Sequence, residues 1–261
     1  MELNIKKDYS WAIVVPTSMG VRICPAEGQP VAASDVFRMQ ATSAETNVAS
    51  IASYLGMPVK VLTTFVKGSP IAAFIKQNLR SRGMTFEGKE VEQGGPWGFR
   101  HQFNIADSGC GSRGPRVQND RAGEVHAIFS EIASNADILV GNEEDFQLCL
   151  GIKGPEAGGK DIASKIESFK EMIGRVKAAY PNAKVFATTL RQVVNANTHL
   201  WGAIMLAGDE WHVVEPREIR VLDRIGGGDG FVGGLLYAAL KGWEPEKWIQ
   251  FGWASGALAT T

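Results

Sequence analysis

The sequence has few cysteines, no long apolar run and almost no net charge, and each shortage excludes a class of protein. Its three cysteines among 261 residues lie far apart, which argues against a disulfide framework and against a zinc site built from paired ligands. No stretch is apolar for long enough to span a bilayer. The five apolar residues from Trp11 to Val15 are too few for the core of a signal peptide. We therefore expect a cytoplasmic protein.

The net charge of the chain argues against partners that bind through long-range electrostatic attraction to a whole protein surface. Lys plus Arg number 27 and Asp plus Glu number 28, which gives a net charge of −1. Such a chain has no attraction for a nucleic-acid backbone or an anionic membrane, so we expect neither partner. Any anionic ligand must be captured by a local site. The length allows one large or two small globular domains, and we expect a single domain over residues 1–261.

The order of apolar patterns predicts an α/β fold. Short β-branched runs alternate with longer helical patterns, which is typical of a mostly parallel sheet covered by helices. Strands are predicted at Trp11–Val15, Val59–Thr64, Ile138–Gly141, Val185–Thr189 and Gly202–Leu206. Helices are predicted at Glu45–Leu55, Pro70–Arg82, Ile162–Ala179, Gly228–Leu240 and Glu246–Ala259. In the third of these helices apolar residues recur every three or four positions, so we expect one buried stripe and a purely structural role.

Two segments interrupt this alternation. Residues 16–40 and 94–120 are rich in Gly, Ser, Pro and Arg, and the second contains short strand-like pieces flanked by turns. Together they could form a small β lid beside the main sheet. The alternative is that both are surface loops, because long loops are common at the surface of such folds.

A run of glycines near the carboxyl end is the most informative segment. Gly226, Gly227 and Gly228 come directly before a helical pattern, and Asp229 follows them. Glycines at the start of a helix let several backbone N–H groups and the positive end of the helix dipole converge on one point, which suits a phosphate. A carboxylate there could act as a base beside that phosphate. The alternative is an ordinary turn with Asp229 as a helix cap.

Other motifs that would explain these glycines fit poorly. The G-x-G-x-x-G spacing of dinucleotide-binding proteins occurs at Gly228, Gly230 and Gly233, but no strand follows to supply the ribose-binding acid. A second match at residues 109–114 runs into Pro115 without a helix behind it. No P-loop motif is present, and the four histidines lack metal-ligand spacing.

The segment from Asp223 to Phe231 resembles the signature D-T-x-G-A-G-D-x-F of the ribokinase-like (phosphofructokinase-B type) carbohydrate kinases. Its Arg-Ile-Gly-Gly-Gly-Asp version is similar to the 2-keto-3-deoxygluconate kinase branch. Further segments resemble motifs of the family in the family's order, and they are residues 44–49 (AETNVA), 120–123 (DRAG) and 137–145 (DILVGNEED). Residues 187–191 (ATTLR) and 201–203 (WGA) resemble motifs of the 2-keto-3-deoxygluconate kinase branch.

This resemblance implies a three-layer, ribokinase-like α/β domain with a β lid, which phosphorylates a hydroxyl of a sugar or sugar acid from MgATP. The acceptor that it favours is 2-keto-3-deoxygluconate. It implies Asp229 as the general base and Gly226–Gly228 as the anion hole, in agreement with the reading of the glycine run.

The same resemblance implies further site residues. The expected substrate ligands are Asn47, Arg121 and Arg100, since a planar guanidinium suits a carboxylated sugar. The expected nucleotide ligands are Thr189, Arg191 and Arg224. Mg²⁺ would be held through water by Asn142 and Asp145, the second of which stands where the family usually has Glu.

Some features depart from the family pattern. Thr42 and Ser43 stand where the family usually has two glycines, so the identity of the acceptor stays open. One alternative is a non-catalytic sugar- or nucleotide-binding relative. The other is a kinase for another sugar or a nucleoside. The chain is short, and we expect missing segments near residues 124–130 and after residue 261; the alternative is a truncated relative. Because lid strands would leave exposed edges, we also expect a homodimer.

Overall fold

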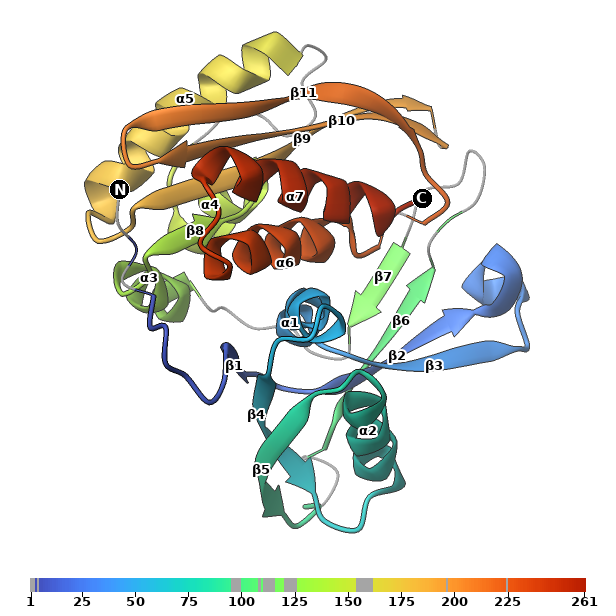
Figure 1. Cartoon of the computed structure of the whole chain (residues 1–261). Helices are drawn as coiled ribbons and strands as arrows, with labels where there is room; N and C mark the ends of the chain where they lie inside the picture. The colour runs from blue at the N-terminus through green and yellow to red at the C-terminus, as the bar shows by residue number, and fades with distance from the viewer. Residues whose placement is uncertain are drawn as a thin grey trace.

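The computed structural model describes residues 3, 5–94, 100–107, 109, 116–119, 126–153, 162–195, 197–223 and 225–261. Their strands gather into three sheets, with helices packed on the sheet faces (Figure 1). The predicted α/β class is confirmed. Within these residues no helix has both the length and the apolar character that crossing a membrane requires.

The first sheet is parallel and is formed by the amino-terminal third of the chain. Its order is β1-β4-β5, from β1 (Ile13–Pro16), β4 (Val59–Val66) and β5 (Thr85–Val91). It packs with α1 (Ala44–Tyr54) and α2 (Pro70–Ser81) around a core that includes the fully buried Val61, Ile75 and Leu79. The start of α2 follows from Ser69, whose hydroxyl accepts hydrogen bonds from the first free N–H groups of the helix.

The second sheet is mixed, and it forms the middle layer of the carboxyl-terminal half. In the order β11-β10-β9-β8, the strands β8 (Ile138–Val140) and β9 (Val185–Asn195) are parallel. The strands β9, β10 (Thr198–Ala207) and β11 (Glu210–Arg220) are antiparallel neighbours. The pattern of the sequence did not predict β11, because its exposed polar residues break the apolar run that marks the other strands.

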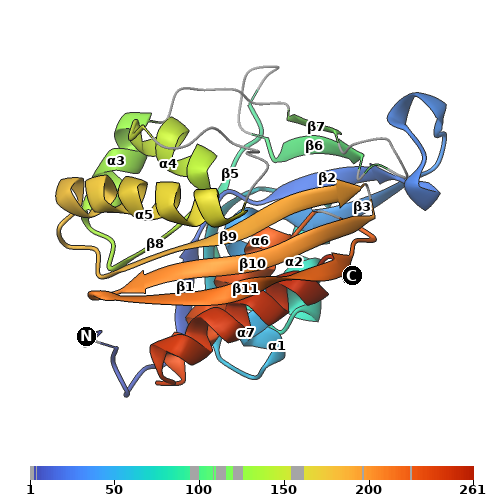
Figure 2. The same cartoon turned by 90° about the horizontal axis from the view of Figure 1, so that it is seen from above.

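Helices cover both faces of this second sheet (Figure 2). One face carries α3 (His126–Ser134), α4 (Glu143–Leu150) and α5 (Ile162–Ala179), and the other carries α6 (Gly227–Leu240) and α7 (Pro245–Leu258). The predicted stripe of α5 is confirmed in its described part, since Phe169, Met172, Ile173 and Val176 are buried in one core cluster. This arrangement gives the three layers, α/β/α, that the family resemblance implies.

The two lid segments of the sequence meet in the third sheet. Its order is β3-β2-β6-β7, from β2 (Gly20–Pro25), β3 (Phe37–Thr42), β6 (Gln102–Asp107) and β7 (Arg116–Asn119). Two short 3-10 helices, Ala26–Gly28 and Val31–Ala33, connect β2 to β3. This sheet lies beside the main body in Figure 1. Because β3 leads directly into α1, the lid is joined to the helix that faces the glycine run.

The missing segment expected near residues 124–130 begins outside the described residues, and α3 starts at His126. Among the described strands, β1 pairs only with β4 and β8 only with β9, so no ladder joins the first sheet to the second. Instead, α1 packs against α6. The approach is close, since a Cβ added at Gly233 would lie 2.5 Å from the carbonyl oxygen of Val48.

Candidate active site

The glycine run forms the start of α6, and its three glycines have different surroundings. Gly226 caps the helix with φ of 98° and ψ of −8°, a left-handed conformation that favours glycine. Gly227 lies against α7, where an added Cβ would meet Thr260 Cγ2 at 2.7 Å. At Gly228 an added Cβ would meet no atom within 4 Å. Packing and backbone conformation explain the first two glycines, whereas Gly228 leaves open space at the helix start.

Asp229 lies in the first turn of α6 and is partly buried. Its Oδ2 accepts a 3.0 Å hydrogen bond from Nδ2 of Asn47 on α1. Burial raises the pKa of the Asp229 carboxyl above its ordinary value of 3.8, the Asn47 hydrogen bond and the charge of Arg22 oppose the rise, and the charge of Glu45 adds to it. A carboxylate that is desolvated in this way is a stronger base than one in water.

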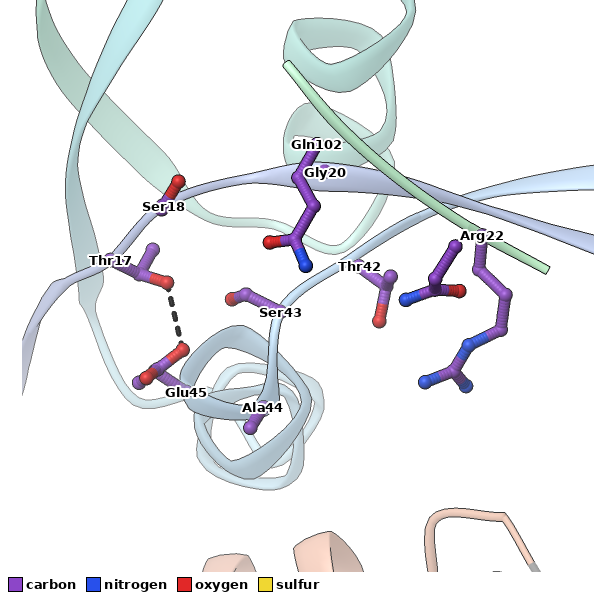
Figure 3. A pocket seen from close by; sticks show the side chains of 10 residues that line it. Thr17, Ser18, Gly20, Arg22, Thr42, Ser43, Ala44, Glu45 and Gln102 are labelled. Atoms are coloured by element: carbon purple, nitrogen blue, oxygen red, sulfur yellow. Dashed lines mark hydrogen bonds between the residues drawn. The ribbon is translucent and has the colours of Figure 1, made fainter. Parts of the chain in front are cut away.

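Three cavities lie in this region, and Asp229 lines two of them. A cavity of about 230 Å³ is lined by Asp229, Asn47, Arg22 and Arg82, among others. A second of about 310 Å³ lies under the lid and shares Arg22 with the first (Figure 3). A third of about 690 Å³ lies on the other side and is lined by Gly228 and Asp229. Asp229 therefore stands between the lid side and the large cavity.

The lid cavity presents a donor and an acceptor that have no partner. The Nε atom of Arg22 and the Oδ1 atom of Asn104 are both shielded from solvent, and neither has a hydrogen-bond partner among the described residues. The two residues face each other across the parallel strands β2 and β6, and both line the cavity. Buried polar groups are nearly always paired, so these atoms indicate the place of a polar ligand.

The opposite wall of the lid cavity is the start of α1. Ser43 caps this helix by accepting a 3.1 Å hydrogen bond from the Thr46 N–H, and Thr17 donates a 2.8 Å hydrogen bond to Glu45 (Figure 3). Ser43 has φ of −155° and ψ of 155°, which any residue adopts. The helix therefore starts without the glycine that the family pattern has at this position.

Comparison with known proteins decides the family of this chain. A family model described as pfkB family carbohydrate kinase matches residues 105–261, which is more than half of the sequence. The chain belongs to the pfkB family of carbohydrate kinases. The resemblance read from the sequence motifs is thereby confirmed.

Individual relatives of this pfkB chain are distant. It is 20% identical over 135 residues to 5-dehydro-2-deoxygluconokinase of Clostridium perfringens, and the match covers 52% of this chain and 34% of that protein. It thus spans about a third of the length of this curated relative. The structure of 2-dehydro-3-deoxygluconokinase of Thermotoga maritima is similar with a TM-score of 0.79 at 21% identity, covering 95% of this chain and 93% of that one. A protein from E.coli assigned as a ribokinase II, solved in complex with ATP and Mg²⁺, gives 0.69 at 14% identity and covers 96% and 93%. These likenesses show the ribokinase-like fold.

The structure brings one group of predicted site residues together. Thr189 on β9, together with Asn142 and Asp145 at the start of α4, lines the large cavity that also contains Gly228 and Asp229. Residues expected to bind nucleotide and Mg²⁺ therefore share one space with the expected base. Their spacing in the sequence gave no indication of this shared cavity.

Asn142 and Asp145 also have a structural role. The Asn142 N–H donates to Asp145 Oδ2 at 2.8 Å, and the Asp145 N–H donates to Asn142 Oδ1 at 2.9 Å. This reciprocal pair is a capping box at the start of α4. Asp145 keeps its second oxygen, for which the described residues supply no hydrogen bond. No group of three or more His, Cys, Asp or Glu that could hold a metal occurs among the described residues.

Of the four arginines predicted to bind substrate or nucleotide, neither of the two that the structure describes is found in these cavities. Arg100 and Arg191 are exposed, and neither lines any of the three cavities. Arg121 and Arg224 lie outside the described residues. The guanidinium that the resemblance leads us to expect in the site is instead available from two arginines that the sequence analysis did not select.

These two residues are Arg22 on β2 and Arg82 at the end of α2, and both line the cavity that contains Asp229. A signal existed for Arg22, because a charged residue stands within the otherwise apolar strand pattern of residues 20–25. No comparable signal existed for Arg82, which follows an ordinary amphipathic helix.

Proposed function

We propose that this pfkB chain transfers the terminal phosphoryl group of ATP to a hydroxyl of a sugar acid, with Asp229 as the general base. The observation that carries the proposal is the position of Asp229. It lies in the first turn of α6, between the cavity of about 230 Å³ that Arg22 and Arg82 also line and the larger cavity that Gly228 lines. A base that removes the proton of the acceptor hydroxyl must lie within hydrogen-bond reach of that hydroxyl, and in-line transfer requires the phosphoryl group to lie next to it.

The chemistry follows from these positions. The acceptor oxygen forms a bond to the terminal phosphorus, the bond from phosphorus to the bridging oxygen of ATP breaks, and ADP leaves. Asp229 takes the proton of the attacking hydroxyl. The free N–H groups at the start of α6 would stabilise the charge on the transferred group, because the helix dipole is positive there. The open space at Gly228 leaves room for that group.

The lid cavity supports an acid as the acceptor. Arg22 offers an unpaired guanidinium N–H and Asn104 an unpaired carbonyl oxygen, which suit a carboxylate and a neighbouring hydroxyl. The kinases of Clostridium perfringens and Thermotoga maritima are named for 5-dehydro-2-deoxygluconate and 2-dehydro-3-deoxygluconate. We propose 2-dehydro-3-deoxygluconate, also called 2-keto-3-deoxygluconate, as the first acceptor to test.

Mg²⁺ fits this site as an ion that enters with the nucleotide. Mg²⁺ is commonly bound by one or two carboxylates, waters and substrate phosphates. Asp145 offers a carboxylate oxygen on the wall of the large cavity, and Asn142 lies beside it. When bound, the ion would neutralise charge on the ATP phosphates. The structure of an E.coli protein of similar fold, which was solved in complex with ATP and Mg²⁺, supports this assignment.

The proposal is tested by assaying ADP formation with ATP, Mg²⁺ and a panel of acceptors. The panel contains the two sugar acids above, ribose and adenosine. We expect transfer to a sugar acid, loss of transfer in Asp229→Asn, and unchanged transfer in the control Asp209→Asn, whose carboxylate is on an exposed turn. Full activity in Asp229→Asn would overturn the mechanism. Ligand-dependent stabilisation without any product would instead support a non-catalytic binding protein.

We also propose that the lid mediates a homodimer. Several apolar side chains on one face of its sheet are exposed, namely Phe37, Met39 and Ile105. A second copy could cover them together with the sheet edges. Light scattering after size exclusion should give twice the mass of the chain, and a monomer at micromolar concentration would contradict this.

A further inference from the structure

Arg82 caps the end of α2, and its side chain reaches the cavity of Asp229 although α2 lies outside that cavity. Nη2 donates a 2.6 Å hydrogen bond to the carbonyl of Ala41, and Nη1 donates to Oδ1 of Asn47 at 3.4 Å. The Arg82 carbonyl accepts a 2.7 Å hydrogen bond from Ser53 on α1. The residue is thus fixed at both its backbone and its guanidinium.

The guanidinium of Arg82 has no acidic partner within salt-bridge distance in the described part of the chain. Arg82 is half-buried, and a partly desolvated cation without a carboxylate is costly, because its desolvation is not offset by a full opposite charge. Burial indeed lowers the pKa of Arg82 below its ordinary value. An arginine kept here at this cost has a role other than stabilising the fold by an ion pair.

The contacts of Arg82 determine which way the amide of Asn47 points. A guanidinium carries only donors, so the carbonyl oxygen of Asn47 must face Arg82. The amide nitrogen then faces the other side, where it donates to Thr42 Oγ1 at 3.3 Å and to Asp229 Oδ2 at 3.0 Å. If the Asn47 amide were flipped, its NH₂ group would face the N–H groups of Arg82, and its oxygen would face the carboxylate oxygen of Asp229.

We propose that Arg82 is a positioning residue, which holds the Asn47 amide in the one orientation that binds and orients the carboxylate of Asp229. The role of that carboxylate as the base rests on the proposed function above. With Oδ2 occupied by Asn47, Oδ1 is the atom left for the acceptor hydroxyl. The chain of contacts from Arg82 through Asn47 to Asp229, which we call the relay, therefore selects the carboxylate oxygen that accepts the proton.

Three charged side chains from the described elements lie around Asp229. Arg22 faces it from the lid strand β2 and Glu45 from α1, and Arg82 lines the same cavity from α2. The Asn47 hydrogen bond favours the charged form of Asp229, as does Arg22. If Arg82 no longer holds Asn47, Asp229 should take up its proton at a higher pH.

The first test measures the titration of Asp229 by NMR with ¹³C-labelled aspartate, assigned through Asp229→Asn. It needs no turnover. We expect the midpoint to move upward in Arg82→Met and to return part of the way in Arg82→Lys, which restores the charge and some donors. It should not move in the control Arg80→Met, because the Arg80 guanidinium lies over the Phe86 ring and lines none of the three cavities. An unchanged midpoint in Arg82→Met, or an equal shift in Arg80→Met, would overturn the proposal.

Asn47→Ala provides a second variant that does not depend on the folding of Arg82→Met. It should raise the midpoint by itself, and adding Arg82→Met to it should produce little further change, because both act through one contact. Additive shifts in the double variant, or no shift in Asn47→Ala, would contradict the relay.

Steady-state kinetics with the sugar acid form the last arm. A misplaced base should lower kcat of Arg82→Met by about 10- to 100-fold and leave KM within about twofold. The acid limb of its pH profile should move in the same direction as the NMR midpoint. Failure of wild-type protein to phosphorylate any acceptor would reject the proposed function, while the NMR titration still decides whether Arg82 orients Asp229.

Discussion

Asn47 and Asp229 are joined by a 3.0 Å hydrogen bond although 182 positions separate them in the sequence. The bond links the helix that follows the lid to the helix that starts with the glycine run. Any shift of α1 relative to α6 would therefore change the position of the carboxylate. The close approach of α1 and α6 at Gly233 limits such a shift.

Asp229→Asn should abolish most of the activity and at the same time stabilise the protein. Loss of a general base costs about 10²- to 10⁴-fold in kcat. Burial raises the pKa of Asp229 above 3.8. At neutral pH the carboxylate is therefore charged and desolvated in the folded wild type, whereas water solvates the same charge in the unfolded chain. Urea unfolding at pH 7 should show the variant to be more stable than the wild type.

The pH dependence of this difference has a definite sign. Because the folded state binds the Asp229 proton at a higher pH than the unfolded state, the cost of the Asp229 charge to wild-type stability is lost as the pH falls through the folded pKa towards 3.8. The advantage of Asp229→Asn should therefore shrink on acidification. A stability difference that stays constant from pH 7 to pH 4 would contradict the direction of the shift.

Local signals explain why so many elements could be predicted. The five predicted helices agree with the structure to within one residue at each end, because each carries its own apolar period and several carry caps such as Ser69. The hairpin of β10 and β11 is different. Its strand β11 is recognisable only from its pairing with β10, which a local pattern does not contain.

The site residues also divide into those that a local sequence pattern predicts and those that only the fold brings into place. Asp229 and the glycines were found because they are contiguous and chemically distinctive, and Asn47 because it stands in a motif. Arg82 reaches the site only through a long side chain from the end of another helix. Asn142 and Asp145 show a further limit, since their spacing of three suits both a capping box and a place beside Mg²⁺.

Gly228→Ala should separate the ligand role of the glycine run from its structural role. An added Cβ meets no protein atom there, so the variant should fold and gain up to about 1 kcal/mol from the helix propensity of Ala. Activity should nevertheless fall, because the methyl group occupies the space of the phosphoryl group.

The matched control for this change is Gly174→Ala in α5, where an added Cβ also meets nothing within 4 Å. It should show the same gain in unfolding free energy with unchanged kcat and KM for ATP. Normal kinetics in Gly228→Ala would show that this position does not border the nucleotide.

His101 should make stability fall on mild acidification. Its Nε2 accepts a 3.3 Å hydrogen bond from the Val66 N–H, and its Nδ1 lies 3.3 Å from the carbonyl of Met19. Because a carbonyl only accepts, Nδ1 carries the proton and the ring is neutral. A second proton on Nε2 would oppose the Val66 N–H.

Burial lowers the pKa of His101 below 6.5, the Met19 contact opposes this, and the charge of Lys76 adds to it. The unfolded chain therefore binds this proton at a higher pH, so stability should decline as the pH falls below about 6.5. Urea unfolding between pH 8 and pH 5 should show this decline in the wild type and a smaller one in His101→Gln. Parallel curves for the two proteins would refute the assignment.

Arg22→Met should change which acceptor is used. Removal of the guanidinium that faces Asn104 across β2 and β6 should raise KM for a sugar acid by about 10- to 100-fold, the effect of losing one charge-assisted hydrogen bond of 1.5–3 kcal/mol. A neutral sugar offers no carboxylate to Arg22, so its kcat/KM should change far less. The control Arg38→Met alters an exposed arginine on the neighbouring strand β3 and should affect neither acceptor. An equal loss for acid and neutral acceptors in Arg22→Met would mean that Arg22 shapes the lid and does not bind a carboxylate.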